Sequence, residues 1–256
     1  MTPGQAALAI AIGLVSGVLA GLFGVGGGIV MTPGLQTVLG LPPIVALATP
    51  LPVIVPTAVS GALRYRRDGE IDLRAAGWMI VGGMPAAAVG AFATEFIETG
   101  LLLIVTAALL AWQAVGILRG ARRAERSAWR TPSTGAFLAI GVAAGLISGL
   151  LGIGGGLVMV PAMAGLLGMP LRRALGTSLA AIVGMVIPGT IVHAALGNID
   201  WLVALFASIG AVPGARVGAS IALGTRERTL RLLVGTFMFV VAVAYGISEA
   251  LRLVGG

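Results

Sequence analysis

The chain has 256 residues, of which 58% are hydrophobic and only 10% are charged. Soluble domains carry about a quarter charged residues, so this composition excludes a soluble globular protein. The net charge of +7 comes from 16 arginines, with no lysine, against 9 acidic residues. These arginines lie mainly in short loops between apolar runs, which favours charges that set membrane topology over a nucleic-acid-binding surface.

Apolar runs of about 20 residues recur along the chain, and each is long enough to cross the roughly 30 Å core of a bilayer as a helix. The alternation typical of a closed β-barrel is not visible, so we expect helical spans. The chain contains no cysteine, which excludes disulfides, thiolate metal sites and thiol catalysis. The predicted fold class is an all-α integral membrane protein, a polytopic helical bundle, and we expect neither a cofactor nor a metal.

The first predicted half covers residues 1–118 and opens with a helical hairpin at residues 5–41. Its two arms meet at Gly24–Gly28, where consecutive glycines weaken a helix and permit a sharp reversal. The second arm is short, so the pattern leaves open whether the hairpin is re-entrant or crosses the membrane fully. Three predicted spans follow, at residues 44–63, 75–93 and 101–118, and prolines interrupt the first of them.

A basic linker at residues 119–133 leads to a second half, residues 134–256, which repeats the same order. It has a hairpin at residues 135–168, broken at Gly152–Gly156, and spans at residues 174–193, 201–223 and 232–250. Shifting residues 17–42 by 128 positions superimposes them on residues 145–170 with 13 of 26 positions identical. Repetition at half the chain length indicates a tandem duplication.

Loop charges predict how the two halves are oriented. Arginines of the first half cluster in residues 64–74, whereas those of the second half cluster at Arg172–Arg173 and residues 226–231, and the loop at residues 194–200 has none. Positively charged loops face the cytoplasm. All these clusters and the linker are cytoplasmic together only if each half crosses the membrane an odd number of times. The sequence therefore predicts inverted-topology repeats with both chain ends outside.

Glycine breaks at corresponding places in two inverted halves are the pattern that best marks a transporter binding site. Backbone N–H groups at the helix starts near Gly28 and Gly156 carry positive partial charge and suit an anion. We therefore predict that the two breaks approach each other and bind substrate through Gly26, Gly27, Gly28, Gly154, Gly155 and Gly156. Two other pairs, Gly17/Gly21 and Gly145/Gly149, are instead typical of close helix packing.

Four polar residues complete the predicted substrate-binding set. Arg216 lies in the middle of the span at residues 201–223, where a charge is costly and usually lines a cavity, although an arginine that bonds helix carbonyls is the second interpretation. Thr49, Thr177 and Ser178 follow the hairpins and offer hydroxyls to an oxyanion, with ordinary helix–helix hydrogen bonding as an equal alternative. For His193, at a span end, we favour an interfacial anchor over a proton relay.

The doubled motif is similar to that of a known family. Residues Gly21–Gly28 read Gly-Leu-Phe-Gly-Val-Gly-Gly-Gly and residues Gly149–Gly156 read Gly-Leu-Leu-Gly-Ile-Gly-Gly-Gly, each followed by a proline at Pro33 or Pro161. Over nearly the whole chain this pattern resembles the TauE/SafE sulfite exporter family of membrane permeases. The resemblance implies movement of a small anion, such as sulfite or an organosulfonate, through the bacterial inner membrane by export or uptake.

We expect a multi-pass secondary transporter of a small sulfur-containing anion in the cell inner membrane. An anion channel, or an uptake permease for another small oxyanion on the same scaffold, is the alternative. An enzyme is not expected, because no nucleophile, metal cluster or acid–base pair lies at membrane depth. The predicted partners are the anion and the lipid bilayer, with a homodimer left open and no nucleic acid. The identity of the anion, the direction of transport and the coupling ion stay open.

Overall fold

The computed structural model describes residues 1–93, 115, 133–152 and 154–255. These residues form helices and connecting turns without strands, which confirms the all-α class. Apart from residues 115 and 133, the predicted span at residues 101–118 and the linker lie outside this part of the chain. The helices are α1 (Pro3–Phe23), α2 (Gly28–Val38), α3 (Pro43–Ala48), α4 (Pro50–Arg67), α5 (Leu73–Ala93), α7 (Thr134–Leu151), α8 (Gly156–Pro161), the π-helical η2 (Ala162–Leu166), α9 (Leu171–Ala195), α10 (Trp201–Gly224) and α11 (Glu227–Gly255).

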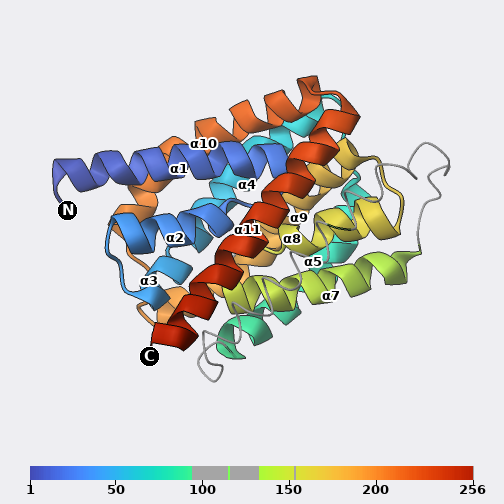
Figure 1. The fold of residues 1–256 in the computed structure, drawn as a ribbon. Helices are drawn as coiled ribbons and strands as arrows, with labels where there is room; N and C mark the ends of the chain where they lie inside the picture. The colour runs from blue at the N-terminus through green and yellow to red at the C-terminus, as the bar shows by residue number, and fades with distance from the viewer. Residues whose placement is uncertain (94–114, 116–132, 153, 256) are drawn as a thin grey trace.

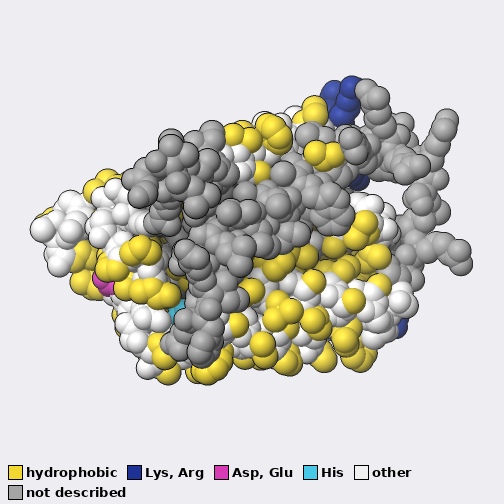
Figure 2. All heavy atoms as spheres, turned by 60° about the horizontal axis from the view of Figure 1, so that its bottom comes forward, with side chains coloured by type: hydrophobic (Ala, Val, Ile, Leu, Met, Phe, Trp, Pro, Cys, Tyr) yellow, Lys and Arg dark blue, Asp and Glu magenta, His cyan; other side chains and the backbone are white. Residues whose placement is uncertain are grey.

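Six helical segments of the described residues are long and apolar enough to cross a membrane: α1, α3 together with α4, α5, α7, α9 and α10. Large apolar side chains such as Val81, Phe92 and Ile191 are exposed on their outer faces. Figure 2 shows apolar side chains over much of one face, with arginines at its right-hand end. A lipid-facing surface explains this exposure, because exposing so large an apolar area to water is unfavourable.

The return arm of each hairpin is much shorter than its first arm. Helix α1 has 21 residues, whereas α2 has 11, a length of about 16 Å at 1.5 Å per residue. In the second half, α8 and η2 together form one apolar segment over Gly156–Leu166. Each return arm is therefore about half as long as the bilayer core is thick.

Prolines divide one span of the first half, as the sequence predicted. Helix α3 ends at Ala48 and α4 starts at Pro50, although Thr49 keeps a right-handed helical backbone and the segment Pro43–Arg67 remains one span. Pro50 has no N–H to donate to the preceding turn. The equivalent residue of the second half is Ser178, and there α9 is continuous.

The prediction of a basic loop at residues 226–231 is wrong in part. Helix α11 begins at Glu227 and includes Arg228 and Arg231. Arg231 Nη2 lies 2.8 Å from Glu227 Oε1, one helical turn away. An acidic residue in the first turn and an ion pair at this spacing both favour helix. The predicted span at residues 232–250 lies within α11.

The first helix of each half packs against a helix of the other half. Helix α1 runs parallel to α10, and α7 runs parallel to α5 (Figure 1). The parallel direction follows from glycines of α1 and α7 that meet backbone atoms of the partner in ascending order: Gly13, Gly17 and Gly21 meet Ala207, Ala211 and Ala215, and Gly141, Gly145 and Gly149 meet Met79, Gly83 and Ala87. A Cβ atom at these glycines would collide with the partner's backbone, which confirms the predicted close packing of Gly17/Gly21 and Gly145/Gly149.

Helices α4 and α9 cross the centre of the molecule in opposite directions. A Cβ atom at Gly189 would lie 3.8 Å from Leu51, and one at Gly61 would lie 2.9 Å from Leu179, so the order along α9 is the reverse of that along α4. Both helices contribute to the main apolar core. Both glycine turns pack against this central pair.

The arginine clusters of both halves meet at one end of the molecule. Arg64 Nε donates to Ser220 Oγ at 3.0 Å, and Arg172 Nη2 donates to the Thr225 carbonyl at 2.6 Å. Arg173 Nη2 lies 3.6 Å from Asp72 Oδ2. These contacts join the end of α4, the start of α5, the start of α9 and the end of α10.

Candidate functional site

The two glycine breaks are tight turns that require glycine at matching positions. In the first turn, Gly24, Gly26 and Gly27 have φ of 67°, 80° and 84°. In the second, Gly152, Gly154 and Gly155 have φ of 64°, 88° and 72°. Residues with a Cβ atom rarely adopt this left-handed region, so the repeated pattern of glycines follows from the backbone. Helices α2 and α8 then begin at Gly28 and Gly156, as predicted.

The two turns touch each other. A Cβ atom added at Gly156 would collide with the Gly24 carbonyl oxygen and would lie 2.6 Å from Val25 Cα. Gly156 is therefore glycine because the first turn occupies the space beside it. The two breaks therefore lie next to each other, while substrate binding by their glycines stays a prediction.

The second turn lies at the mid-depth of the central helices. A Cβ atom at Gly154 would be 3.5 Å from both Ile54 of α4 and Ile182 of α9. Each isoleucine is one residue from the midpoint of its 25-residue span. Backbone that is not helical is tolerated at this depth only when protein or a cavity surrounds it. All described residues of the second turn are buried.

Two buried hydroxyls fix the first turn and the end of α1 to the central helices. Ser178 Oγ of α9 donates to the Gly24 carbonyl at 2.8 Å, and the Tyr65 hydroxyl of α4 donates to the Gly21 carbonyl at 3.0 Å. Ser178 belongs to the predicted substrate-binding set, but in this structure its hydroxyl donates its hydrogen to a backbone carbonyl of the protein. Tyr65 was not predicted as part of the site. Its only sequence signal is an aromatic hydroxyl at the position equivalent to His193.

Thr49 and Thr177 make equivalent hydrogen bonds, with the two halves of the chain exchanged. Thr49 Oγ1 accepts the backbone N–H of Asp200 at 3.1 Å, and Thr177 Oγ1 accepts the backbone N–H of Asp72 at 2.9 Å. Each threonine therefore connects the central span of its own half to the following span of the other half. Both threonines are fully buried. As acceptors in these bonds, both keep a hydroxyl hydrogen that can be donated elsewhere.

Comparison with known proteins agrees with the arrangement of turns and spans. A family model described as "Sulfite exporter TauE/SafE" matches residues 9–245. The chain belongs to the TauE/SafE family. The probable membrane transporter protein YunE of Bacillus subtilis is 30% identical over 88% of this chain and 91% of its own length. A probable membrane transporter protein of Methanocaldococcus jannaschii is 25% identical over 92% of this chain and 93% of its own length. No solved structure matches the chain.

Membership of this family, together with the six apolar spans, makes the chain a multi-pass transporter protein of the cell inner membrane. The expectation of a transporter rather than an enzyme agrees with the names of these relatives. The matched residues include both glycine turns and all six apolar spans except the first six residues of α1.

Arg216 of this TauE/SafE protein is exposed on α10, whereas the glycine turns are buried. The buried residues of α10, among them Ala215 and Ala219, lie on the face that packs against α1. Arg216 therefore does not share the buried surface that holds the turns. The Arg216 carbonyl accepts the Ser220 hydroxyl at 2.9 Å.

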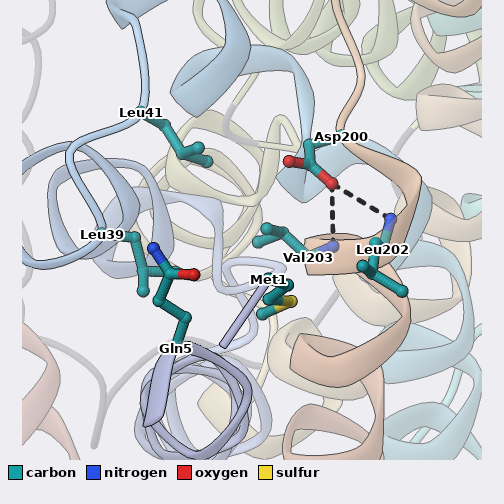
Figure 3. A pocket seen from close by; sticks show the side chains of 7 residues that line it. All are labelled: Met1, Gln5, Leu39, Leu41, Asp200, Leu202 and Val203. Atoms are coloured by element: carbon teal, nitrogen blue, oxygen red, sulfur yellow. Dashed lines mark hydrogen bonds between the residues drawn. The ribbon is translucent and has the colours of Figure 1, made fainter. Parts of the chain in front are cut away.

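A separate cavity of about 190 Å³ lies at the end of the molecule opposite the arginine clusters. Figure 3 shows its lining, formed by Met1, Gln5, Leu39, Leu41, Asp200, Leu202 and Val203. The Asp200 carboxylate accepts the backbone N–H groups of Leu202 and Val203 at 3.1 and 3.0 Å. This carboxylate is thus the N-cap of α10, and the cavity is apart from the predicted glycine site.

His193 is buried near the end of α9 rather than exposed at the surface. Its Nδ1 atom lies 3.4 Å from Asn198 Nδ2, in the loop that follows the helix. Because this side chain is buried within the protein, His193 does not face the membrane–water interface as the predicted anchor would. A role in proton transfer stays untested.

Proposed function

We propose that this TauE/SafE protein is a secondary transporter of a small sulfur-containing anion, sulfite or an organosulfonate. The observation that carries the proposal is the contact between two glycine turns at the mid-depth of the central spans. Main-chain N–H groups at the starts of α2 and α8 provide positive partial charge without side chains that would fill the space. The substrate site is Gly26, Gly27 and Gly28 with Gly154, Gly155 and Gly156.

The two halves, residues 1–118 and 134–256, are proposed to be inverted-topology repeats joined by the linker at residues 119–133. Three observations support this arrangement. The equivalent helices α4 and α9 run in opposite directions. The pairs α1 with α10 and α7 with α5 repeat the same contact with the halves exchanged. The arginine clusters of both halves gather at one end, as expected for loops that face the cytoplasm.

Inverted repeats suit alternating access, in which one half moves against the other around a fixed site. In the conformation described here the turns are in contact, so an anion enters only when they separate. Thr49, Thr177 and Ser178 connect the halves near the turns, and their contact with the anion stays a prediction. The predicted role of Arg216 and the homodimer also stay predictions, and an exposed Arg216 meets the anion only outside the buried turns.

The test is a flux assay with the purified protein in liposomes, using labelled sulfite and labelled ethanesulfonate. We expect transport that saturates with concentration, because a carrier binds its substrate in each cycle. Currents that rise without saturation would support the anion channel instead. Absence of flux for both anions would contradict the proposal.

A matched pair of glycine variants tests the location of the site. Gly155→Ala and Gly197→Ala place a Cβ atom on backbones with the same φ of 72°. At Gly155 the new atom would be 2.9 Å from the Ala144 carbonyl oxygen, whereas at Gly197 nothing lies within 4 Å. We expect Gly155→Ala to abolish flux and Gly197→Ala to keep it. Equal flux in the two variants would argue against a site at the turns.

A further inference from the structure

Ser16 of α1 is a fully buried serine whose hydroxyl is not bonded. Its exposed fraction is 0%, and Ser16 Oγ has no hydrogen-bond partner among the residues that the structure describes. A buried hydroxyl without a partner is destabilising by about 1–3 kcal/mol. Such a group needs an explanation, and a ligand that completes the bond is one.

Many other hydroxyls of this protein donate to the carbonyl four residues earlier at 2.6–2.9 Å, as seen for Thr37, Thr57, Thr190, Ser208, Ser220 and Thr225. Ser60 and Ser178 instead donate to carbonyls of other segments. Ser16 does not make this bond with the Ile12 carbonyl, and Thr32 of α2 does not make it with the Gly28 carbonyl. Neither hydroxyl is therefore satisfied by its own helix.

Ser16 lies on the side of α1 that faces the first glycine turn and α2. Gly34 of α2 packs against Ile12, and Gly27 of the turn packs against Ser16 and Ala20. Residues 12, 16 and 20 are spaced by four and form one stripe of α1. A Cβ atom at Gly27 would lie 3.0 Å from the Ser16 carbonyl oxygen, so the first turn sits directly over this serine. Ser16 is thus buried directly beneath the residue that precedes α2.

The second half lacks hydroxyls at the positions equivalent to Ser16 and Thr32. Ala144 and Val160 occupy the positions equivalent to Ser16 and Thr32, 128 residues later. The return arms are otherwise alike, because neither α2 nor α8 has a side-chain cap on its first N–H groups. The buried serine of α7 is Ser148, which is equivalent to Ala20 and not to Ser16.

We propose that Ser16 is a substrate-binding residue whose hydroxyl donates a hydrogen bond to the anion at the start of α2. Thr32 is the second donor. The first hairpin accordingly supplies two side-chain donors to the anion. This inference rests on the proposed function and adds to it side-chain donors that the main-chain N–H groups alone do not supply.

Ser16→Ala tests the inference in two measurements on the full-length protein. A hydrogen bond to a charged group contributes about 1.5–3 kcal/mol, so we expect the KM for labelled sulfite in liposomes to rise roughly tenfold or more. Without anion, the melting temperature should stay the same or rise, because the variant removes an unpaired buried hydroxyl. With sulfite added, the stabilisation seen for the unchanged protein should be lost or reduced.

Ser208→Ala is the matched control, because Ser208 is a partly buried serine that bonds the Ala204 carbonyl of its own helix. We expect its KM to equal that of the unchanged protein, and Thr32→Val to raise the KM as Ser16→Ala does. An unchanged KM in Ser16→Ala, with transport intact, would overturn the inference and leave the proposed function standing. If the unchanged protein neither transports sulfite or ethanesulfonate nor is stabilised by them, both fall.

Discussion

Gly156 must be glycine because of the space around it. It starts α8 directly after two glycines with positive φ, and its missing side chain leaves room for the Gly24 carbonyl and Val25 of the first turn. The requirement at Gly155 is conformational, whereas that at Gly156 is spatial. The same triplet in sequence therefore has two physical causes, and only the second depends on the other half of the chain.

Gly156→Ala is expected to lower the melting temperature of the purified protein. The added methyl would force the two turns apart, and overpacking of this kind costs about 1–3 kcal/mol. Gly77→Ala is the control, because Gly77 lies in α5 with nothing within 4 Å of its Cβ position. Alanine favours helix over glycine, so Gly77→Ala should leave the melting temperature unchanged or raise it. A Gly156→Ala protein as stable as the unchanged one would mean that the turns do not pack as described.

Among the helices, the central spans are held by paired contacts that cross between the halves. Thr49 accepts the Asp200 N–H and Thr177 accepts the Asp72 N–H, and each aspartate then begins a helix of the other half. These bonds satisfy donors that precede α10 and α5. They explain why threonine recurs at both positions without any appeal to a ligand.

Thr49→Val and Thr177→Val are each expected to lower the melting temperature, and the KM for sulfite tests whether the threonines also contact the anion. Valine matches threonine in shape but leaves a backbone N–H without its acceptor, a cost of about 1–3 kcal/mol. Thr37→Val, at an exposed threonine that bonds its own helix, should have a much smaller effect. If the KM rose while the melting temperature did not fall, the two buried threonines would contact the anion, as the sequence analysis first suggested.

For the whole molecule, the two ends differ in chemistry. One end gathers Arg64, Arg172 and Arg173 with their partners. The opposite end has the cavity beside Asp200, lined mostly by apolar side chains. Such a difference between the two ends is expected for inverted repeats whose arginine loops face the cytoplasm.

Cysteine labelling tests this orientation, and the chain suits it because it has no cysteine of its own. Arg67→Cys and Arg226→Cys, both exposed at the arginine end, should react with a membrane-impermeant maleimide only from the cytoplasmic side. Val38→Cys and Leu196→Cys, exposed at the opposite end, should react only from outside. Labelling of Arg67→Cys and Arg226→Cys from different sides would rule out the proposed inversion.

The sequence by itself determined the helical membrane class, the duplication and the positions of the glycine turns. These features depend on local composition and on the backbone freedom of glycine, which act within a few residues. It also located the close packing of Gly17/Gly21 and Gly145/Gly149, because small residues spaced by four leave a groove on a helix.

Only the tertiary structure decided what the polar residues contact. Thr177 and Asp72 are 105 residues apart, and Ser178 and Gly24 are 154 apart, so no local pattern could pair them. The exposure of Arg216 depends on which face of α10 packs against α1, and the importance of Tyr65 and Ser16 depends on where the first turn folds back. Long-range packing sets these contacts, whereas the position of a residue in a span leaves its direction undecided.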